Sequence, residues 1–224
     1  MGFVGTELEK RVKEEYEKFG NNLYRLIAFR TGELLKLHLD IVVRCSIRFG
    51  DIFDIGSVID HTSGLSESIN RDASISLLHE APALWGSGES LGVNRPWLDR
   101  APYKIGVINE DSVKVTYWKD SPRTFYLARV FIPRRIRLST QYVLMTLVNE
   151  PCVSNVWWPI KPKENESNIT ILPYLVYMNS IFGFINLLGE RLETEGLYME
   201  LKKNHLREMP IPDLRKKFCE EDII

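Results

Sequence analysis

The sequence predicts an α+β fold with N-terminal helices, a central and mostly antiparallel sheet, and a buried C-terminal helix followed by a short strand and a short helix. Apolar residues recur at helical spacing over residues 6–38, strand-like segments fill residues 103–157, and residues 169–188 are nearly all apolar. A length of 224 residues suits one large domain or a domain with an appendage. We therefore divide the chain into a helical N-terminal section, residues 1–39, and an α+β region, residues 40–224.

The helical prediction for residues 6–38 rests on a capping signal and on periodicity. Thr6 is followed three residues later by Glu9, the spacing at which two side chains satisfy the free N–H groups of a first helical turn. Gly20–Asn22 is expected to divide the section into two helices. From Ile41 to Phe49 apolar and polar residues alternate, which predicts a half-buried strand.

A strand-rich stretch follows residues 50–102, whose weak periodicity predicts short elements and long loops. The predicted strands are Tyr103–Ile108, Val113–Trp118, Phe125–Phe131, Arg137–Val148 and Cys152–Trp157. Turn-forming residues such as Asn109–Asp111 and Asn149–Pro151 separate them. Strands so closely spaced can pair antiparallel through hairpin connections.

The apolar segment Ile169–Leu188 has the length of a membrane span, so two interpretations arise. Pro173, Asn179 and Asn186, together with the lack of a basic flank, favour a buried core helix over a membrane helix. A short strand over Leu197–Leu201 and a short helix from Lys203 to Met209 are predicted after it. Pro210 and Pro212 end that helix and fix an extended exit of the chain, because neither residue donates a backbone hydrogen bond.

Composition excludes several classes of protein. The chain has 29 Lys and Arg against 30 Asp and Glu, and 44% of its residues are hydrophobic, which is typical of an ordinary globular protein. Cys45, Cys152 and Cys219 are few, odd in number and without a CxxC pair, which argues against a disulfide framework or a structural zinc site. Together with the absence of a signal peptide, this predicts a cytoplasmic protein that does not bind a membrane.

The balanced total charge conceals a basic segment. Residues 123–163 contain seven Arg and Lys side chains against Glu150 alone. One interpretation is a solvated strand edge; the other is a face that binds a polyanion. Arginine is the more frequent of the two cations here, and its guanidinium group grips phosphates and guanine edges with two parallel hydrogen bonds.

Residues that would carry catalysis are scattered. The four histidines are far apart in the sequence and none has a metal-ligand spacing. Asp51, Asp54 and Asp60 suit turns better than a divalent cation. We therefore predict no catalytic residue, no metal and no cofactor.

Several segments carry a family resemblance in a fixed order. They are Ala83–Gly86, Arg134–Gln141, Asn149–Pro151, Val156–Pro159, Tyr177–Gly183, Glu193–Lys203 and Leu206–Leu214. This order resembles the C-terminal, non-catalytic target-recognition region of adenine-N6 DNA methyltransferases, including methylase-like proteins of restriction and phage-defence systems. The resemblance covers residues 40–217.

The chain departs from that family in its catalytic motifs. Such enzymes bind S-adenosylmethionine through a Gly-containing motif and grip the target adenine with a motif that contains Pro-Pro, and this sequence has no Pro-Pro dipeptide. We expect the chain not to transfer methyl groups on its own. The resemblance implies a module that binds double-stranded DNA and acts with a separate methylase or nuclease subunit. The alternative is a protein-interaction module, or a split-gene remnant, without DNA binding.

The candidate nucleic-acid-binding residues are Arg134, Arg135, Arg137, Thr140, Gln141, Trp158, Lys202 and Lys203. Alternation along a strand places at most two of the three arginines on one face. Gln141 suits an adenine edge and Thr140 a phosphate or a thymine methyl group. One of Trp157 and Trp158 either packs in the core or stacks on an unpaired base. The predicted structural residues are Trp157, Asn179, Ser180, Gly183, Pro210 and Pro212.

Overall fold

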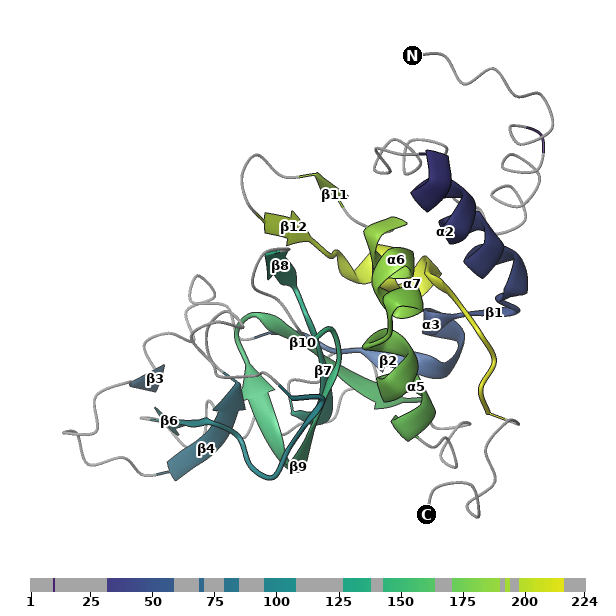
Figure 1. Ribbon diagram of the computed structural model, residues 1–224. Helices are drawn as coiled ribbons and strands as arrows, with labels where there is room; N and C mark the ends of the chain where they lie inside the picture. The colour runs from purple at the N-terminus through teal and green to yellow at the C-terminus, as the bar shows by residue number, and fades with distance from the viewer. Residues whose placement is uncertain are drawn as a thin grey trace.

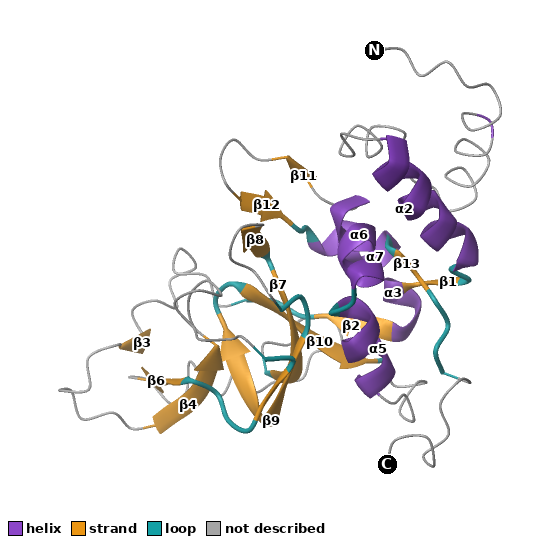
Figure 2. Cartoon of the chain, in the orientation of Figure 1, coloured by secondary structure: helices purple, strands orange, loops and turns teal. Residues whose placement is uncertain are grey.

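The computed structural model describes residues 32–58, 69–70, 79–84, 95–107, 127–137, 143–163, 171–189, 192–193 and 198–215, together with Lys10. Helices gather at one end of a sheet that extends away from them (Figure 1). The combination of separate helices and a mostly antiparallel sheet confirms the predicted α+β class (Figure 2). The division into residues 1–39 and 40–224 stays a prediction.

The helices are α2 (Gly32–Arg44), α3 (Phe49–Ile52), α5 (Ile171–Met178), α6 (Ile181–Gly189) and α7 (Lys203–Glu208). The strands are β1 (Ile47–Arg48), β2 (Phe53–Ile55), β3 (Ile69–Asn70), β4 (His79–Leu84), β5 (Trp97–Leu98), β6 (Tyr103–Val107), β7 (Ala128–Pro133), β8 (Arg135–Arg137), β9 (Thr146–Ser154), β10 (Trp157–Pro162), β11 (Leu192–Glu193), β12 (Tyr198–Glu200) and β13 (Pro210–Ile211). The strand and helix predicted near residues 197–209 are thus present as β12 and α7.

Strand β9 is the centre of an eight-stranded sheet. The strand order is β2-β10-β7-β9-β4-β6-β3, and β5 pairs with β9 off this path. The β4–β9 and β5–β9 ladders are parallel, and every other ladder of this sheet is antiparallel. Two smaller sheets, β1–β13 and β11–β12–β8, join segments that are remote in the sequence.

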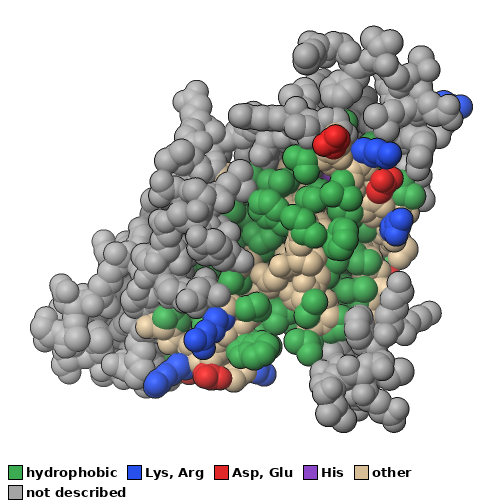
Figure 3. Space-filling view, in the orientation of Figure 1, with side chains coloured by type: hydrophobic (Ala, Val, Ile, Leu, Met, Phe, Trp, Pro, Cys, Tyr) green, Lys and Arg blue, Asp and Glu red, His purple; other side chains and the backbone are tan. Residues whose placement is uncertain are grey.

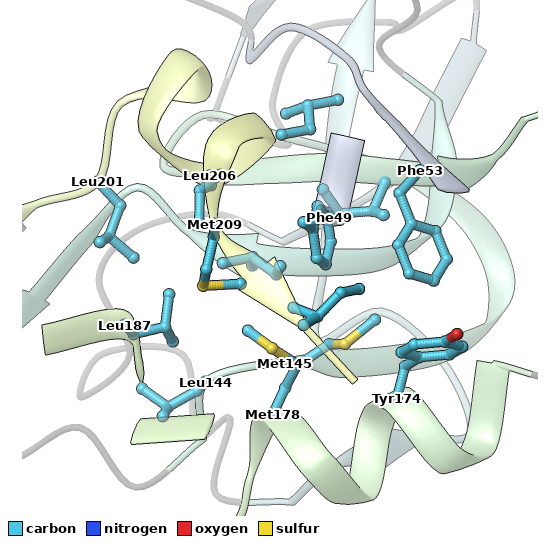
Figure 4. Close-up of a cluster of buried hydrophobic side chains, with 14 of the residues drawn as sticks. Phe49, Phe53, Leu144, Met145, Tyr174, Met178, Leu187, Leu201, Leu206 and Met209 are labelled. Carbon is cyan, nitrogen blue, oxygen red and sulfur yellow. The ribbon is translucent and has the colours of Figure 1, made fainter. Parts of the chain in front are cut away.

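Alternation along β7 gives the sheet two covered faces. Val130 and Ile132 face a core that they share with α3, α5, α6 and α7, whereas Phe131 faces a second, smaller core with Trp157. In the larger core, the rings of Phe49 and Phe53 lie 4.7 Å apart between centroids (Figure 4). Tyr174 meets Phe53 edge-on at 5.2 Å. Aromatic side chains bury large apolar areas, so this core is the main source of stability that the helices and the sheet share.

The apolar C-terminal segment forms two helices, not the single helix predicted over Ile169–Leu188. Helices α5 and α6 are bent by 74° at Asn179 and Ser180. No single helix among the described residues is long and apolar enough to cross a membrane. Taken together, the two bent helices meet the criteria of length and apolar composition only. Nine-residue α6 buries Gly183, Ile185 and Leu187 in the protein.

Asn179 lies at the bend, and its side chain hydrogen-bonds backbone groups of α5 and of the segment just before β9. Its Oδ1 accepts from the backbone N–H of Leu144 at 2.8 Å and of Met145 at 3.3 Å. Its Nδ2 donates to the carbonyls of Met145 at 2.7 Å and Leu175 at 2.8 Å. The amide thus fastens the helix pair to the start of β9, and the polar residue inside an apolar segment is a structural joint.

Ser180 and Gly183 complete this joint. The Ser180 hydroxyl donates to the Tyr177 carbonyl at 2.6 Å and accepts from the Gly183 N–H at 3.3 Å. A Cβ at Gly183 would lie 2.3 Å from that same carbonyl oxygen, so only glycine allows this close approach.

Three strand predictions are wrong, and the first is Ile41–Phe49. Residues predicted to begin a strand at Ile41 instead finish α2, which ends at Arg44, and only Ile47–Arg48 pair as β1. Leu35, Leu39 and Ile41 bury one side of α2 against Ile185 of α6, and this packing overrides the local alternation.

The predicted strand Arg137–Val148 is also wrong, because β8 and β9 belong to different sheets. Residues Asn149–Pro151, where a turn was expected, instead form part of β9. The pairing of β9 with β7 shifts register at this point, so Pro151, which has no backbone N–H, needs no partner in the ladder. The turn follows instead at Ser154, whose hydroxyl accepts from the N–H groups of Val156 and Trp157. The predicted strand Cys152–Trp157 is therefore wrong as well, because it spans the end of β9, this turn and the start of β10. Helices predicted between residues 6 and 31 and the strand Val113–Trp118 lie outside the described residues.

Replacing Asn179 by Ala removes the joint between α5, α6 and β9. We expect the free energy of unfolding to fall by about 2–3 kcal/mol, because several part-buried backbone groups lose their partner. Chemical denaturation measures the loss, with Asn204→Ala on the exposed side of α7 as control. A loss below about 0.5 kcal/mol, as for an ordinary surface position, would contradict the role of Asn179.

Candidate nucleic-acid interface

Strands β8, β10 and β12 meet helix α7 at one corner of the protein, and this corner brings three predicted segments together. The backbone N–H of Arg134 donates to Val156 at 2.8 Å, and its carbonyl accepts from Leu201 at 2.8 Å. Arg135 stands opposite Glu200 in the β8–β12 ladder. Arg134, Arg135, Trp158 and Lys202–Lys203 therefore become neighbours although they are far apart in the sequence.

Trp158 is the centre of this corner. Its indole N–H donates to the Leu201 carbonyl at 2.8 Å. The Arg134 guanidinium carbon lies 5.5 Å and the Lys203 ammonium 5.0 Å from the centroid of its ring system. Both distances allow cation–π attraction. Trp158 thus binds protein cations, while Trp157, with 1% of its surface exposed, packs in the smaller core.

Arg134 and Arg135 have different environments, as alternation along the strand predicts. Arg134 is half-buried and forms an ion pair with Glu200, whose carboxylate lies 3.5 Å from its guanidinium. Arg135 is exposed and has no ion pair among the described residues. Arg134 therefore stabilises the corner, and Arg135 presents its charge to solvent.

Lys203 is held in place by two neighbours. Its ammonium donates to the Ser57 hydroxyl at 2.8 Å and lies over Trp158. Arg207, one helical turn further along α7, adds a second positive charge. Burial first, and then this charge, lower the pKa of Lys203 from 10.5 to about 8. The corner thus concentrates positive charge beyond what its own carboxylates neutralise.

The carboxylates of β12 and α7 are already occupied by arginines. Glu200 pairs with Arg134, and Glu208 pairs with Arg48 of β1 at 2.7 Å. Arg135, Lys202 and Arg207 are exposed and form no ion pair within the described part of the chain. We call Arg135, Lys202, Lys203 and Arg207 the cationic corner. Its charges are available to an anionic ligand.

The other predicted residues lie in different settings. Arg137 ends β8 opposite Tyr198, and Thr140 and Gln141 lie outside the described residues. Pro210 is buried in β13, where its carbonyl accepts a hydrogen bond from Asn186 and the strand pairs with β1. Pro212 is half-buried just after it.

Sequence reasoning missed two members of the corner. Arg207 follows Lys203 by one helical turn, so the spacing of the predicted helix indicates that the two side chains lie on the same face. Ser57 lies 146 residues before Lys203, and no local pattern links the two.

Other reactive groups are dispersed or buried. No group of three or more His, Cys, Asp or Glu among the described residues is arranged to hold a metal ion. Burial raises the pKa of the Cys45 and Cys152 thiols to about 12.

Solved structures include proteins of similar fold, whereas family models and curated sequences give no match. The chain is similar to the crystal structure of the HsdS subunit from Thermoanaerobacter tengcongensis, with 16% sequence identity and a TM-score of 0.40. The match covers 95% of this chain and 45% of that one, so the chain spans less than half of that subunit.

The pKa of Lys203 tests the geometry of the corner. Replacing Arg207 by Gln removes a nearby positive charge, so the pKa of Lys203 is expected to rise from about 8 toward 10.5. Between pH 8 and pH 10.5, Lys203 is protonated in the unfolded state but largely deprotonated in the folded state. Its titration therefore makes the free energy of unfolding increase with pH in this range. NMR titration of the lysine side chain measures the shift. An unchanged pKa in the variant would show that Arg207 does not act on Lys203.

Proposed function

We propose that this chain is a non-catalytic target-recognition module that binds double-stranded DNA. The cationic corner carries the proposal: exposed Arg135, Lys202 and Arg207 lie around Lys203, while the nearby carboxylates pair with other arginines. Duplex DNA presents closely spaced phosphates, and cations that replace its counterions bind it.

The division of roles within the corner suits phosphate binding. The Arg134–Trp158–Lys203 contacts hold the backbone of β8 and the start of α7 in fixed relation. Arg135, Lys202 and Arg207 project from this support with exposed charges that form no ion pair with any described residue. Phosphate contacts position a protein on DNA, and separate contacts to base edges read the sequence. Thr140 and Gln141 are our candidates for base contacts, since their side chains suit groove edges.

The reaction partner is the second part of the proposal. The sequence resembles the target-recognition region of adenine-N6 DNA methyltransferases and lacks the Pro-Pro motif of their catalytic domain. We propose that a separate methylase or nuclease subunit supplies the chemistry and that this chain selects the DNA. We also propose that the protein acts in the cytoplasm.

Replacing Arg135, Lys202 and Arg207 together by Ala tests phosphate binding. Fluorescence anisotropy with a duplex over a range of KCl concentrations gives the affinity and its salt slope. We expect weaker binding and a slope reduced by about 2–3 in log–log units, since each lost phosphate contact contributes about 0.9. The double variant Lys36→Ala and Arg44→Ala on α2 is the control for the loss of exposed positive charge elsewhere on the protein. Wild-type affinity that does not change with salt would contradict the proposal.

A second candidate function is pairing with another copy of the chain through α2 and α6. Figure 3 shows a broad hydrophobic area over the helices. Leu34, Leu37, Ile181 and Phe182 have 37–61% of their surfaces exposed there. Leu37 and Phe182 line a hollow of about 420 Å³. Exposed apolar areas of this kind are typical of protein interfaces.

The charges of α2 favour a second copy as the occupant of this surface. Glu33, Lys36, Asp40 and Arg44 alternate in sign along the helix, and none forms an ion pair within the described residues. In an antiparallel pair of α2 helices, Glu33 of one copy approaches Arg44 of the other, and Lys36 approaches Asp40. The surface is therefore complementary to itself, as a two-fold interface requires.

Light scattering after size-exclusion chromatography tests this candidate. We expect a dimer that Leu37→Glu converts to a monomer, because the charge would be buried without a partner. Val43→Glu, on another side of α2, is the matched control and leaves the dimer intact. A wild-type monomer at every concentration, or equal loss in both variants, would contradict pairing through this face.

A further inference from the structure

Trp97 is an exposed aromatic side chain on a firmly held strand. It has 59% of its surface exposed, in contrast with buried Trp157. The backbone before it is tied to β9 at two points: the Leu147 N–H donates to the Pro96 carbonyl at 2.8 Å, and the Thr146 hydroxyl donates to the Arg95 carbonyl at 3.3 Å. An indole exposed on such a fixed support is a platform for a planar ligand.

The sheet register places this platform beside a hollow. Trp97 pairs with Leu147, which pairs with Val130, which in turn pairs with Ile160. Partners across a ladder point to the same face of a sheet, so the four side chains form one row. Leu147, Val130 and Ile160 line a hollow of about 480 Å³. Ligand sites of this size are lined mainly by apolar groups, with a few polar groups that orient the ligand.

Cations surround this apolar row. Arg129 lines the hollow, and its Nε donates to the Val148 carbonyl at 3.1 Å. This bond fixes the guanidinium, whose terminal nitrogens have no hydrogen bond to any described residue. Exposed Arg95 and Arg100 flank the β5 strand, where Asp99 is also exposed. Figure 3 shows Lys and Arg side chains gathered near the lower ends of the central strands in that view.

A hydrogen bond fixes the loop after β5 beside this cluster. Glu150 accepts a hydrogen bond from the Ala101 N–H at 2.8 Å, which holds the loop after β5 against β9. The site therefore combines a fixed indole, an apolar hollow and an anchored guanidinium. Nucleic-acid binding sites use aromatic faces for bases and arginines for the adjoining phosphates.

We infer that Trp97 and the adjoining hollow bind an unpaired nucleobase that has left the DNA stack. The base stacks on the Trp97 indole and enters the hollow lined by Leu147, Val130 and Ile160. Arg129 binds a phosphate beside this base. The inference rests on the proposed function, because it names which part of a DNA ligand this second site takes. Every good stacking contact adds affinity, and an unpaired base costs less to withdraw from the duplex than a paired one.

Two DNA duplexes of the same length test the inference: one fully paired, and one with a single bulged 2-aminopurine. Anisotropy gives the affinity for each, and 2-aminopurine fluorescence reports stacking. We expect the wild-type protein to prefer the bulged duplex by about tenfold and to quench its fluorescence. Trp97→Ala abolishes both the preference and the quenching and leaves the affinity for the paired duplex unchanged.

Two further variants make the outcomes distinct. Trp97→Phe keeps an aromatic face and retains most of the preference, which excludes misfolding as the cause of the Ala result. The variant of Arg135, Lys202 and Arg207 weakens binding to both duplexes equally and keeps the ratio between them. A preference that persists in Trp97→Ala overturns this inference alone. Absence of wild-type binding to the paired duplex overturns the proposed function, and binding to an acidic peptide in place of both DNAs overturns both.

Discussion

The contacts between Arg134, Trp158 and Leu201 fix the position of the charges on which the proposed DNA binding depends. The Arg134 backbone bonds to Val156, just before β10, on one side and to Leu201 on the other, and the Trp158 indole, from β10, also bonds to Leu201. These bonds join the end of the large sheet to the start of α7. Together with the β8–β12 ladder, they give Arg135, Lys202 and Arg207 a fixed spacing that can face the phosphates of a duplex.

The corner divides its cations into two groups with different electrostatic roles. Arg134 is half-buried and paired with Glu200. Such an ion pair fixes the geometry of the corner but adds no net charge to it. Lys203 is held between Ser57 and Trp158 with Arg207 close by, and burial first, then the Arg207 charge, lowers its pKa. An anion bound there relieves the repulsion. The arrangement costs some stability in the free protein and favours the bound state.

Local patterns predicted much of the C-terminal half and less of the rest. The strand β12, the helix α7 and the alternation of Arg134 and Arg135 follow from short-range periodicity and from proline chemistry. The bend at Asn179 was not predictable, because its amide bonds to residues 34 and 35 positions away. The end of α2 at Arg44 depends on packing against α6. Ser57 and Trp97 carry no signal of a site until the sheet places them beside Lys203 and Leu147.

Amide chemical-shift mapping by NMR tests directly where DNA binds. Addition of a short duplex is predicted to shift the backbone amides of Arg135, Lys202 and Arg207, while those of Leu35 and Leu39 in α2 stay in place. A duplex that binds with shifts confined to α2 and α6, or that leaves the spectrum unchanged, would contradict the assignment of DNA binding to the cationic corner.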